Sequence, residues 1–171
     1  MSAESAADTV LAPVDGAEFR RTLGHFCSGV TVLAGLDADG APVGLACQSF
    51  TSLSLDPPLI LVCPGKGSTS WPRLAQTGRF AVNVLAEDQA DVCAALGRSG
   101  PRKFDGVAWH RGPGGAFVLD DALAWLDCDI DAVHPGGDHS IVVGAVRRLA
   151  VHRHDAAPLL FFRGGYGLTQ D

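Results

Sequence analysis

Short runs of apolar and β-branched residues follow one another after Gly29, and each run is ended by a turn signal. Residues 29–47 hold two such runs around a Gly-containing turn, which is the pattern of a β-hairpin. Two more runs, 51–55 and 58–63, flank the dipeptide Asp56-Pro57, and proline there excludes both a helix and pairing in the middle of a sheet. The core must therefore be built from strands, and the sequence predicts a mainly β fold.

Further elements follow from the same kind of reasoning. Alternating apolar positions predict additional strands at 79–86, 122–133, 139–151 and 158–163. Capping signals followed by apolar residues at helical spacing predict short helices at about 15–27, 70–77 and 87–97. The total of seven to eight strands and three short helices predicts a mainly antiparallel barrel.

The chain reads as one domain. Residues 1–13 are small and polar and are interpreted as a flexible arm, whereas 14–171 carry the apolar pattern without a repeat or a break in composition. A chain of 171 residues can bury roughly 70% of the surface that its unfolded form exposes, enough for one self-sufficient core. Residues 97–116 are rich in Gly, Pro, Arg and Lys and are predicted to form a long exposed loop.

Charge and cysteine usage exclude several classes of partner. The net charge is −6, and the basic residues are scattered, so no surface for nucleic acid is expected. No apolar run approaches the eighteen or so residues that a membrane span needs, and residues 1–13 do not resemble a signal peptide. Five widely spaced cysteines without a CxxC pair fit reduced thiols. A cytoplasmic protein is expected.

The common catalytic signatures are missing. GxSxG and GxGxxG do not occur, and in CPGKGSTS the residue after Lys66 is glycine instead of the Ser or Thr of a phosphate loop. His152 and His154 have the i, i+2 spacing of one strand face but no Cys or carboxylate partner, so no metal site is expected. Acid–base and nucleophilic catalysis by side-chain triads is therefore not supported.

Neutral hydrogen-bonding side chains interrupt the strand-rich segment instead. Gln48, Ser49, Thr51 and Ser52 lie where two predicted strands meet, and their amide and hydroxyl groups suit a flat heteroaromatic ring with alternating donors and acceptors. The range 66–70, Lys-Gly-Ser-Thr-Ser, comes just before a predicted helix, where a cation and free N–H groups favour a phosphate. Each group has a plainer interpretation, as turn residues and as a helix cap at Ser70.

Several segments together resemble the short-chain flavin reductases, the reductase components of two-component flavin-dependent monooxygenases. The resemblance runs in the same order from Phe19 to Gly167 and is carried by the segments PVGLACQSFTSLSLDPPLILVCPGKGSTSWPRL, RFAVNVLAEDQ, KF, GGDHSIVVGAV and PLLFFRGGYG. It implies a split β-barrel that binds FMN or FAD and transfers a hydride to it from NADH or NADPH. It also implies a homodimer and a separate oxygenase component.

The resemblance also implies which residues form the site. The flavin ring is expected on the first stretch, namely on Gln48, Ser49, Phe50, Thr51, Ser52 and Ser54. The ribityl and phosphate part is expected on the next stretch, on Cys63, Lys66, Gly67, Ser68, Thr69 and Ser70. Phe104 and Tyr166 are expected to wall the pocket, and His139 of the GDH motif to lie on the nicotinamide side as the catalytic residue.

Two other functions stay open at this point. One is a flavin-binding carrier or subunit that does not oxidise a nicotinamide, and the other is a flavoenzyme of the same fold that reduces a different small substrate. The intact GDH and GGYG segments favour the reductase over both. Nothing in the sequence separates FMN from FAD or NADH from NADPH.

Overall fold

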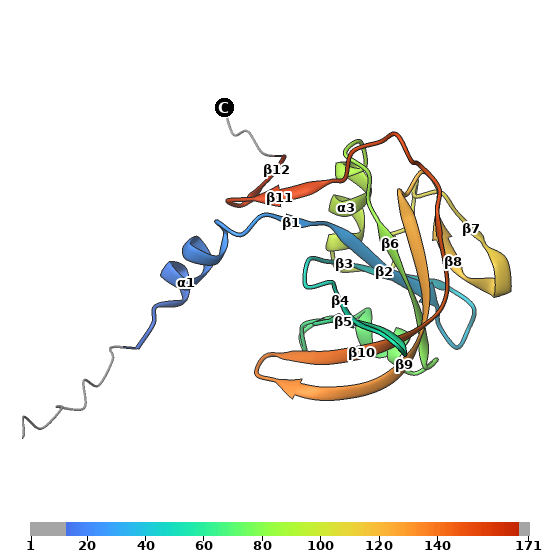
Figure 1. Ribbon diagram of the computed structural model, residues 1–171, viewed down its shortest axis with the longest axis horizontal. Coiled ribbons are helices and arrows are strands. Elements are labelled where there is room, and N and C mark those ends of the chain that lie inside the picture. Colours follow the sequence, from blue (N-terminus) through green and yellow to red (C-terminus); the bar gives the residue numbers. More distant parts are fainter. Residues whose placement is uncertain (1–12, 168–171) are drawn as a thin grey trace, which may run out of the picture.

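A computed structural model describes residues 13–167 (Figure 1). Residues 1–12 of the predicted arm and the last four residues of the predicted domain lie outside the described part. The helices are α1 (Gly16–Leu23), α2 (Trp71–Ala75), α3 (Ala90–Gly97) and the 3-10 turn η1 (Pro113–Gly115). The strands are β1 (Ser28–Gly29), β2 (Thr31–Leu36), β3 (Pro42–Cys47), β4 (Thr51–Leu55), β5 (Pro58–Val62), β6 (Arg79–Val84), β7 (Trp109–Arg111), β8 (Phe117–Leu119), β9 (Ala124–Gly136), β10 (His139–Val151), β11 (Leu160–Phe162) and β12 (Gly165–Tyr166).

A seven-stranded sheet forms the body of the molecule, in the order β3-β2-β6-β9-β10-β5-β4. All its neighbouring strands are antiparallel. Six steps of about 4.8 Å would place the edges of a flat sheet about 29 Å apart. The edge strands β3 and β4 are joined by residues 48–50 alone, and so short a connection spans at most about 14 Å. The sheet therefore curls into an open barrel, which confirms the predicted split β-barrel.

Two apolar clusters cover the two faces of this sheet. Alternate residues of β2 and β6 point to opposite faces, so Leu33 and Val82 join one cluster while Val32 and Ala81 join the other. The first cluster gathers side chains from six strands and from α2. The second packs α3 and β8 against the opposite face. Burial on both faces explains why the sequence of β2 is a continuous apolar run.

A tight turn joins the long strands β9 and β10. Gly136 pairs with His139, so the loop consists of Gly137 and Asp138, and Gly137 has φ +71° as the first loop residue of a type II′ turn requires. The GDH motif is therefore the turn of a hairpin, and it places His139 at the first position of β10.

The structure corrects two predicted elements. The long loop predicted at 97–116 includes β7, which pairs with β8, and the Trp109 ring stacks on Phe117 with 4.2 Å between centroids. The first helix is capped by Asp15 as predicted, because its carboxylate accepts from the backbone N–H of Glu18, but it ends at Leu23 and not near Cys27. No residue of α1 is buried, and this helix projects away from the barrel (Figure 1).

Two further structural facts bear on the sequence expectations. All five cysteines are free, with Cys47, Cys93 and Cys128 buried and the other two half-buried. Within residues 13–167, no helix is both long enough and apolar enough to cross a bilayer.

Candidate functional site

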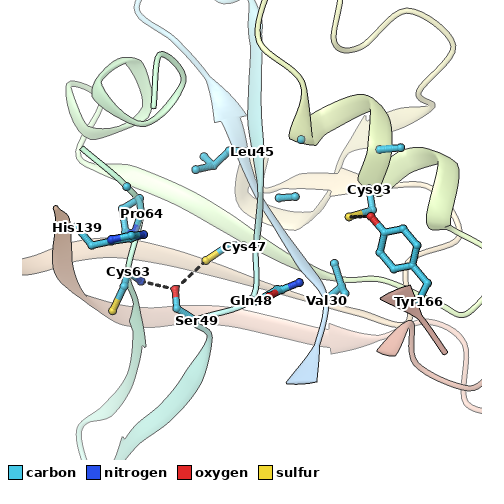
Figure 2. Close-up of a pocket in the computed structure, with 14 residues that line it drawn as sticks. Val30, Leu45, Cys47, Gln48, Ser49, Cys63, Pro64, Cys93, His139 and Tyr166 are labelled. Atoms are coloured by element: carbon cyan, nitrogen blue, oxygen red, sulfur yellow. Dashed lines mark hydrogen bonds between the residues drawn. The ribbon is translucent and has the colours of Figure 1, made fainter. Parts of the chain in front are cut away.

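A cavity of about 520 Å³ opens at the split of the barrel, beside the connection between β3 and β4 (Figure 2). It lies where the ends of β3 and β5 come together with α3 and the starts of β2 and β10. Its lining residues are Val30, Leu45, Ala46, Cys47, Gln48, Ser49, Cys63, Pro64, Gly65, Cys93, Ala94, Gly97, His139 and Tyr166. The lining contains no Asp, Glu, Lys or Arg, so its polar groups are neutral apart from any charge on the imidazole.

Ser49 fastens the two sides of the split together. Its Oγ accepts a hydrogen bond of 2.7 Å from the backbone N–H of Cys63 and lies 3.2 Å from the Cys47 Sγ (Figure 2). Burial raises the pKa of the Cys47 thiol, which therefore stays protonated. The hydroxyl of Ser49 thus shapes the cavity by holding β3 and β5 in place.

Gln48 provides a hydrogen-bonding group at the rim that is not used internally. Its side chain is exposed and lines the cavity. Within residues 13–167, the Gln48 amide neither donates nor accepts a hydrogen bond. A free amide offers both donors and an acceptor, so Gln48 can form hydrogen bonds with the edge of a ligand ring.

His139 is held at one wall of the cavity by the hairpin turn. Its Nδ1 lies 2.7 Å from the Oδ1 of Asp138, and this contact lowers the pKa of the Asp138 carboxyl. The turn is also bonded to the segment after β5. Lys66 donates from its Nζ to the Gly137 carbonyl (2.6 Å) and from its backbone N–H to the backbone carbonyl of Asp138. A Cβ built on Gly65 would lie 3.6 Å from the His139 Nε2, so that nitrogen faces Gly65, which also lines the cavity.

Tyr166 stands at the opposite wall, and Figure 2 shows it and His139 on either side of the cavity. It comes from the short hairpin of β11 and β12, and its hydroxyl donates to the Sγ of Cys93 on α3 at 3.2 Å. The hydrogen bond to Cys93, with partial burial, raises the pKa of Tyr166 to about 12. The phenol is therefore neutral at physiological pH.

A side groove continues from this cavity along β3. A hollow of about 240 Å³ shares Leu45, Ala46, Gly65 and Gly97 with the cavity, and it shares Thr69, Ser99 and Lys103 with a second hollow of about 330 Å³. We call these two hollows together the side groove. The predicted site residues that line it are Ser68, Thr69, Ser70 and Phe104.

Phe104 packs closely against β3. A Cβ built on Gly44 would lie only 2.9 Å from the Phe104 Cζ, so glycine at this position makes room for the ring. The ring also meets Phe117 edge-on, with 5.5 Å between centroids. Phe104 is thus fixed at the side groove and is not a wall of the main cavity.

The structure divides the sequence-predicted residues into two groups. Gln48, Ser49, Cys63, His139 and Tyr166 meet at the cavity, and Ser68, Thr69, Ser70 and Phe104 meet at the side groove. The remaining predicted residues line neither space, and they are Phe50, Thr51, Ser52, Ser54, Lys66 and Gly67. Phe50 packs on the barrel core instead, and the hydroxyl residues after it belong to the edge strand β4.

Sequence reasoning missed the contributions of α3 and of the loop after it. Cys93, Ala94 and Gly97 line the cavity from α3, and Lys103 lines the side groove. The helical pattern of α3 could not show which face meets the cavity. For Lys103 a signal existed, because it precedes Phe104 in the KF segment.

One of the two histidines considered as metal ligands, His152, accepts a hydrogen bond from a tryptophan. The Trp125 Nε1–H donates to the Nε2 of His152 at 2.9 Å. Within residues 13–167, no group of three or more His, Cys, Asp or Glu side chains is arranged to hold a metal ion.

Comparison with known proteins identifies the family of this chain. The family model described as "Flavin reductase like domain" matches residues 23–169. The reductase subunit HsaB of a flavin-dependent monooxygenase from Rhodococcus jostii is 49% identical over 159 residues, covering 92% of this chain and 80% of that protein.

Solved structures agree with this relationship. The nitrilotriacetate monooxygenase component B from Mycobacterium thermoresistibile is 47% identical with a TM-score of 0.84, covering 88% of this chain and 84% of that one. The NADH:FAD oxidoreductase SgcE6 of Streptomyces globisporus, solved with NAD and FAD fragments, is 34% identical with a TM-score of 0.83, covering 91% and 93%. With a matching family model over most of its length and relatives at this level of identity, the chain belongs to the flavin reductase like domain family.

Proposed function

We propose that this protein is an NAD(P)H:flavin oxidoreductase that transfers a hydride from NADH or NADPH to FMN or FAD and supplies the reduced flavin to a separate monooxygenase. Family membership supports this reaction, and so do the relatives named as reductase subunits of such monooxygenases. The observation that carries the proposal is the cavity at the barrel split, with the free amide of Gln48 at its rim and His139 on one wall.

The cavity fits a flavin ring in size and in chemistry. Its volume of about 520 Å³ lies within the range of small-molecule sites. Its walls are largely apolar and carry neutral hydrogen-bonding groups, as a flat uncharged ring requires. A bound flavin supplies the hydride-accepting ring, so the protein has to position ring and nicotinamide but needs no strong acid or base.

One assay tests the reaction and its alternatives. The purified protein is mixed with each reduced nicotinamide and each flavin in turn, and the loss of reduced-nicotinamide absorbance is followed. We expect turnover that requires both partners. Flavin that copurifies tightly without any nicotinamide oxidation would instead identify a carrier or subunit, and turnover only with a third small substrate would identify a different flavoenzyme.

His139 is proposed to orient the nicotinamide. It stands at the start of β10, on one wall of the cavity, and the Asp138 carboxylate fixes its ring. We expect His139→Ala to raise the KM for NADH several-fold while the flavin Kd, measured by fluorescence titration, stays within experimental scatter. Unchanged NADH kinetics in this variant would remove the role.

We propose a homodimer in which α1 packs on the second copy. In α1 and the segment that follows it, Phe19, Leu23 and Phe26 are 54%, 55% and 80% exposed, and large apolar side chains gathered in this way mark interaction surfaces. The helix has no partner surface within residues 13–167, since none of its residues is buried. A second copy supplies such a surface.

The double variant Phe19→Ser, Leu23→Ser tests this arrangement. We expect it to shift the mass measured by light scattering from that of a dimer to that of a monomer, because the apolar contact of α1 is lost. Arg20→Ser on the same helix should stay dimeric. A double variant with the same mass as the parent protein would show that α1 is not in the interface.

A further inference from the structure

Tyr166 is carried by a small hairpin that has few bonds of its own. β11 and β12 pair at two positions only, around a turn formed by Arg163 and Gly164. On its other side β11 pairs with β1, again at two positions, and these three strands form a sheet separate from the barrel. Because a hairpin this short is only marginally stable alone, the position of the tyrosine depends on what its side chain contacts.

A ring contact and a hydrogen bond hold the Tyr166 side chain. Its ring meets Phe161 edge-on, with 5.6 Å between the ring centroids. Its hydroxyl donates to the Cys93 Sγ at 3.2 Å, and Figure 2 shows these two atoms meeting at the wall of the cavity. Within residues 13–167, the hydroxyl forms no other hydrogen bond. Tyr166 is 43% exposed, so a ring released by the sulfur is free to turn toward solvent.

Cys93 is held firmly by α3. It is 6% exposed and belongs to the apolar cluster that packs this helix against the sheet. The start of the helix is fixed by Gln89, whose Oε1 accepts from the Ala86 N–H (3.0 Å) and whose Nε2 donates to the Asp120 carbonyl (2.9 Å). The sulfur atom is therefore part of the body of the protein, and its hydrogen bond links the Tyr166 ring to that body.

The same bond determines what Tyr166 offers to a ligand. The hydrogen bond to Cys93, with partial burial, raises the pKa of Tyr166 to about 12, because a phenol that donates to sulfur loses this bond when it ionises. With its hydrogen already used, the hydroxyl is not a proton donor for a bound molecule. Tyr166 therefore serves the cavity through its ring.

We propose that Cys93 is a positioning residue for the reductase reaction: its sulfur holds the Tyr166 ring as the wall opposite His139, so that flavin and nicotinamide meet in a cavity of constant width. The inference rests on the proposed function, because it assigns Cys93 a part in that reaction through the tyrosine alone. Since a small misplacement of reacting groups lowers a rate strongly, a loosely held ring slows hydride transfer.

A double-variant comparison tests the proposal, with kcat/KM for flavin reduction by NADH as the measurement. Cys93→Ala removes the acceptor and should lower kcat/KM about tenfold, the scale of one hydrogen bond. Tyr166→Phe keeps the ring, removes the donor and should lower kcat/KM at least as much. The double variant should lose no more than Tyr166→Phe alone, because Cys93 acts through the hydroxyl. Losses that multiply would show that Cys93 acts independently of Tyr166, and the proposal would be wrong.

Two further variants complete the comparison. Cys93→Ser replaces the sulfur by another acceptor and should keep kcat/KM within about threefold of the parent value. Cys128→Ala removes a buried thiol that lines neither the cavity nor the side groove, and it should leave kcat/KM unchanged. Should Cys93→Ala fail to fold, Cys93→Val takes its place, since valine fills the space of the sulfur without accepting a hydrogen bond.

Ionisation of Tyr166 tests the bond without any reaction. Tyr166 is the only tyrosine of the 171 residues, so phenolate absorbance reports on it alone. At a pH of about 11, with both proteins shown to be folded by circular dichroism, the parent phenol should stay protonated while that of Cys93→Ala ionises. A parent phenol that ionises together with that of the variant would refute the bond to the sulfur.

The outcomes separate this inference from the proposed function. A parent protein that reduces flavin with NADH, and a Cys93→Ala protein that does so equally well, would refute the positioning role and leave the reductase standing. A parent protein that reduces no flavin would refute both the reaction and the role of Cys93 in it, even if the ionisation of Tyr166 shows the bond to be intact.

Discussion

Ala94→Trp is expected to weaken flavin binding at least about 100-fold, a loss of about 2.7 kcal/mol, and to remove flavin reductase activity to the same extent. Ala94 is exposed on α3 and lines the cavity, so an indole at this position extends into the space between the walls that carry His139 and Tyr166. Since the position is not packed in the core, the larger side chain should not disturb the fold. Flavin fluorescence titration and NADH oxidation measure the two effects.

Two controls accompany this variant. Ala94→Ser adds a single oxygen atom and should keep the parent's flavin Kd. Asp91→Trp places the same indole one turn earlier on α3, on a residue that is exposed and does not line the cavity, and should also retain activity. If Ala94→Trp binds FMN like the parent protein, the flavin does not occupy this cavity, and the proposed site is wrong.

The strands were predictable because their pattern depends on local chemistry and on burial. β2 is buried on both faces, which produces its continuous apolar run in the sequence, and the apolar positions of 79–86 correctly predict β6. Asp56-Pro57 correctly separates β4 from β5. The position of two of the neutral hydrogen-bonding residues in the fold was also predicted correctly. Gln48 and Ser49 lie in the connection between the two edge strands, which is where the barrel is open.

The sequence could not show which polar residues of the range 48–54 would line the cavity and which would not. Gln48 and Ser49 face the cavity, whereas Thr51, Ser52 and Ser54 continue along β4 and do not line it. Adjacent positions in the sequence diverge here because the chain crosses from one edge of the sheet to the other. Which of these residues face the cavity depends on how the sheet closes into a barrel. That closure depends on contacts between residues far apart in the sequence, so residue spacing alone does not predict it.

Contacts between side chains and residues of other helices or strands could not be predicted from the sequence either. The link from Lys103 to Gly44 joins residues 59 positions apart, and no local pattern identifies such a partner. The apolar spacing of α1 was detected, but it predicts an apolar face without indicating what covers it. Within residues 13–167 nothing does, which is why we propose that a second copy of the chain covers it.

Asn83 is a second hidden link, in the middle of the apolar strand β6. It is fully buried, its Oδ1 accepts from the Leu119 N–H at 2.8 Å, and its Nδ2 donates to the Phe117 carbonyl at 3.3 Å. These bonds fasten β8 to the sheet, and β8 in turn holds β7. The long segment after α3, predicted to be an exposed loop, is therefore ordered partly by one amide.

Asn83→Leu should lower the free energy of unfolding by about 3 kcal/mol. The leucine has a similar shape but leaves the N–H of Leu119 and the carbonyl of Phe117 buried without partners, and each unsatisfied buried group costs about 1–3 kcal/mol. Urea unfolding measures the loss as a lower midpoint at an unchanged slope. Thr31→Val is the matched control, because it removes one buried hydrogen bond, from Oγ1 to the Cys47 carbonyl, and should cost about 1 kcal/mol. An Asn83→Leu protein as stable as the Thr31→Val protein would mean that β8 is held by its apolar contacts alone.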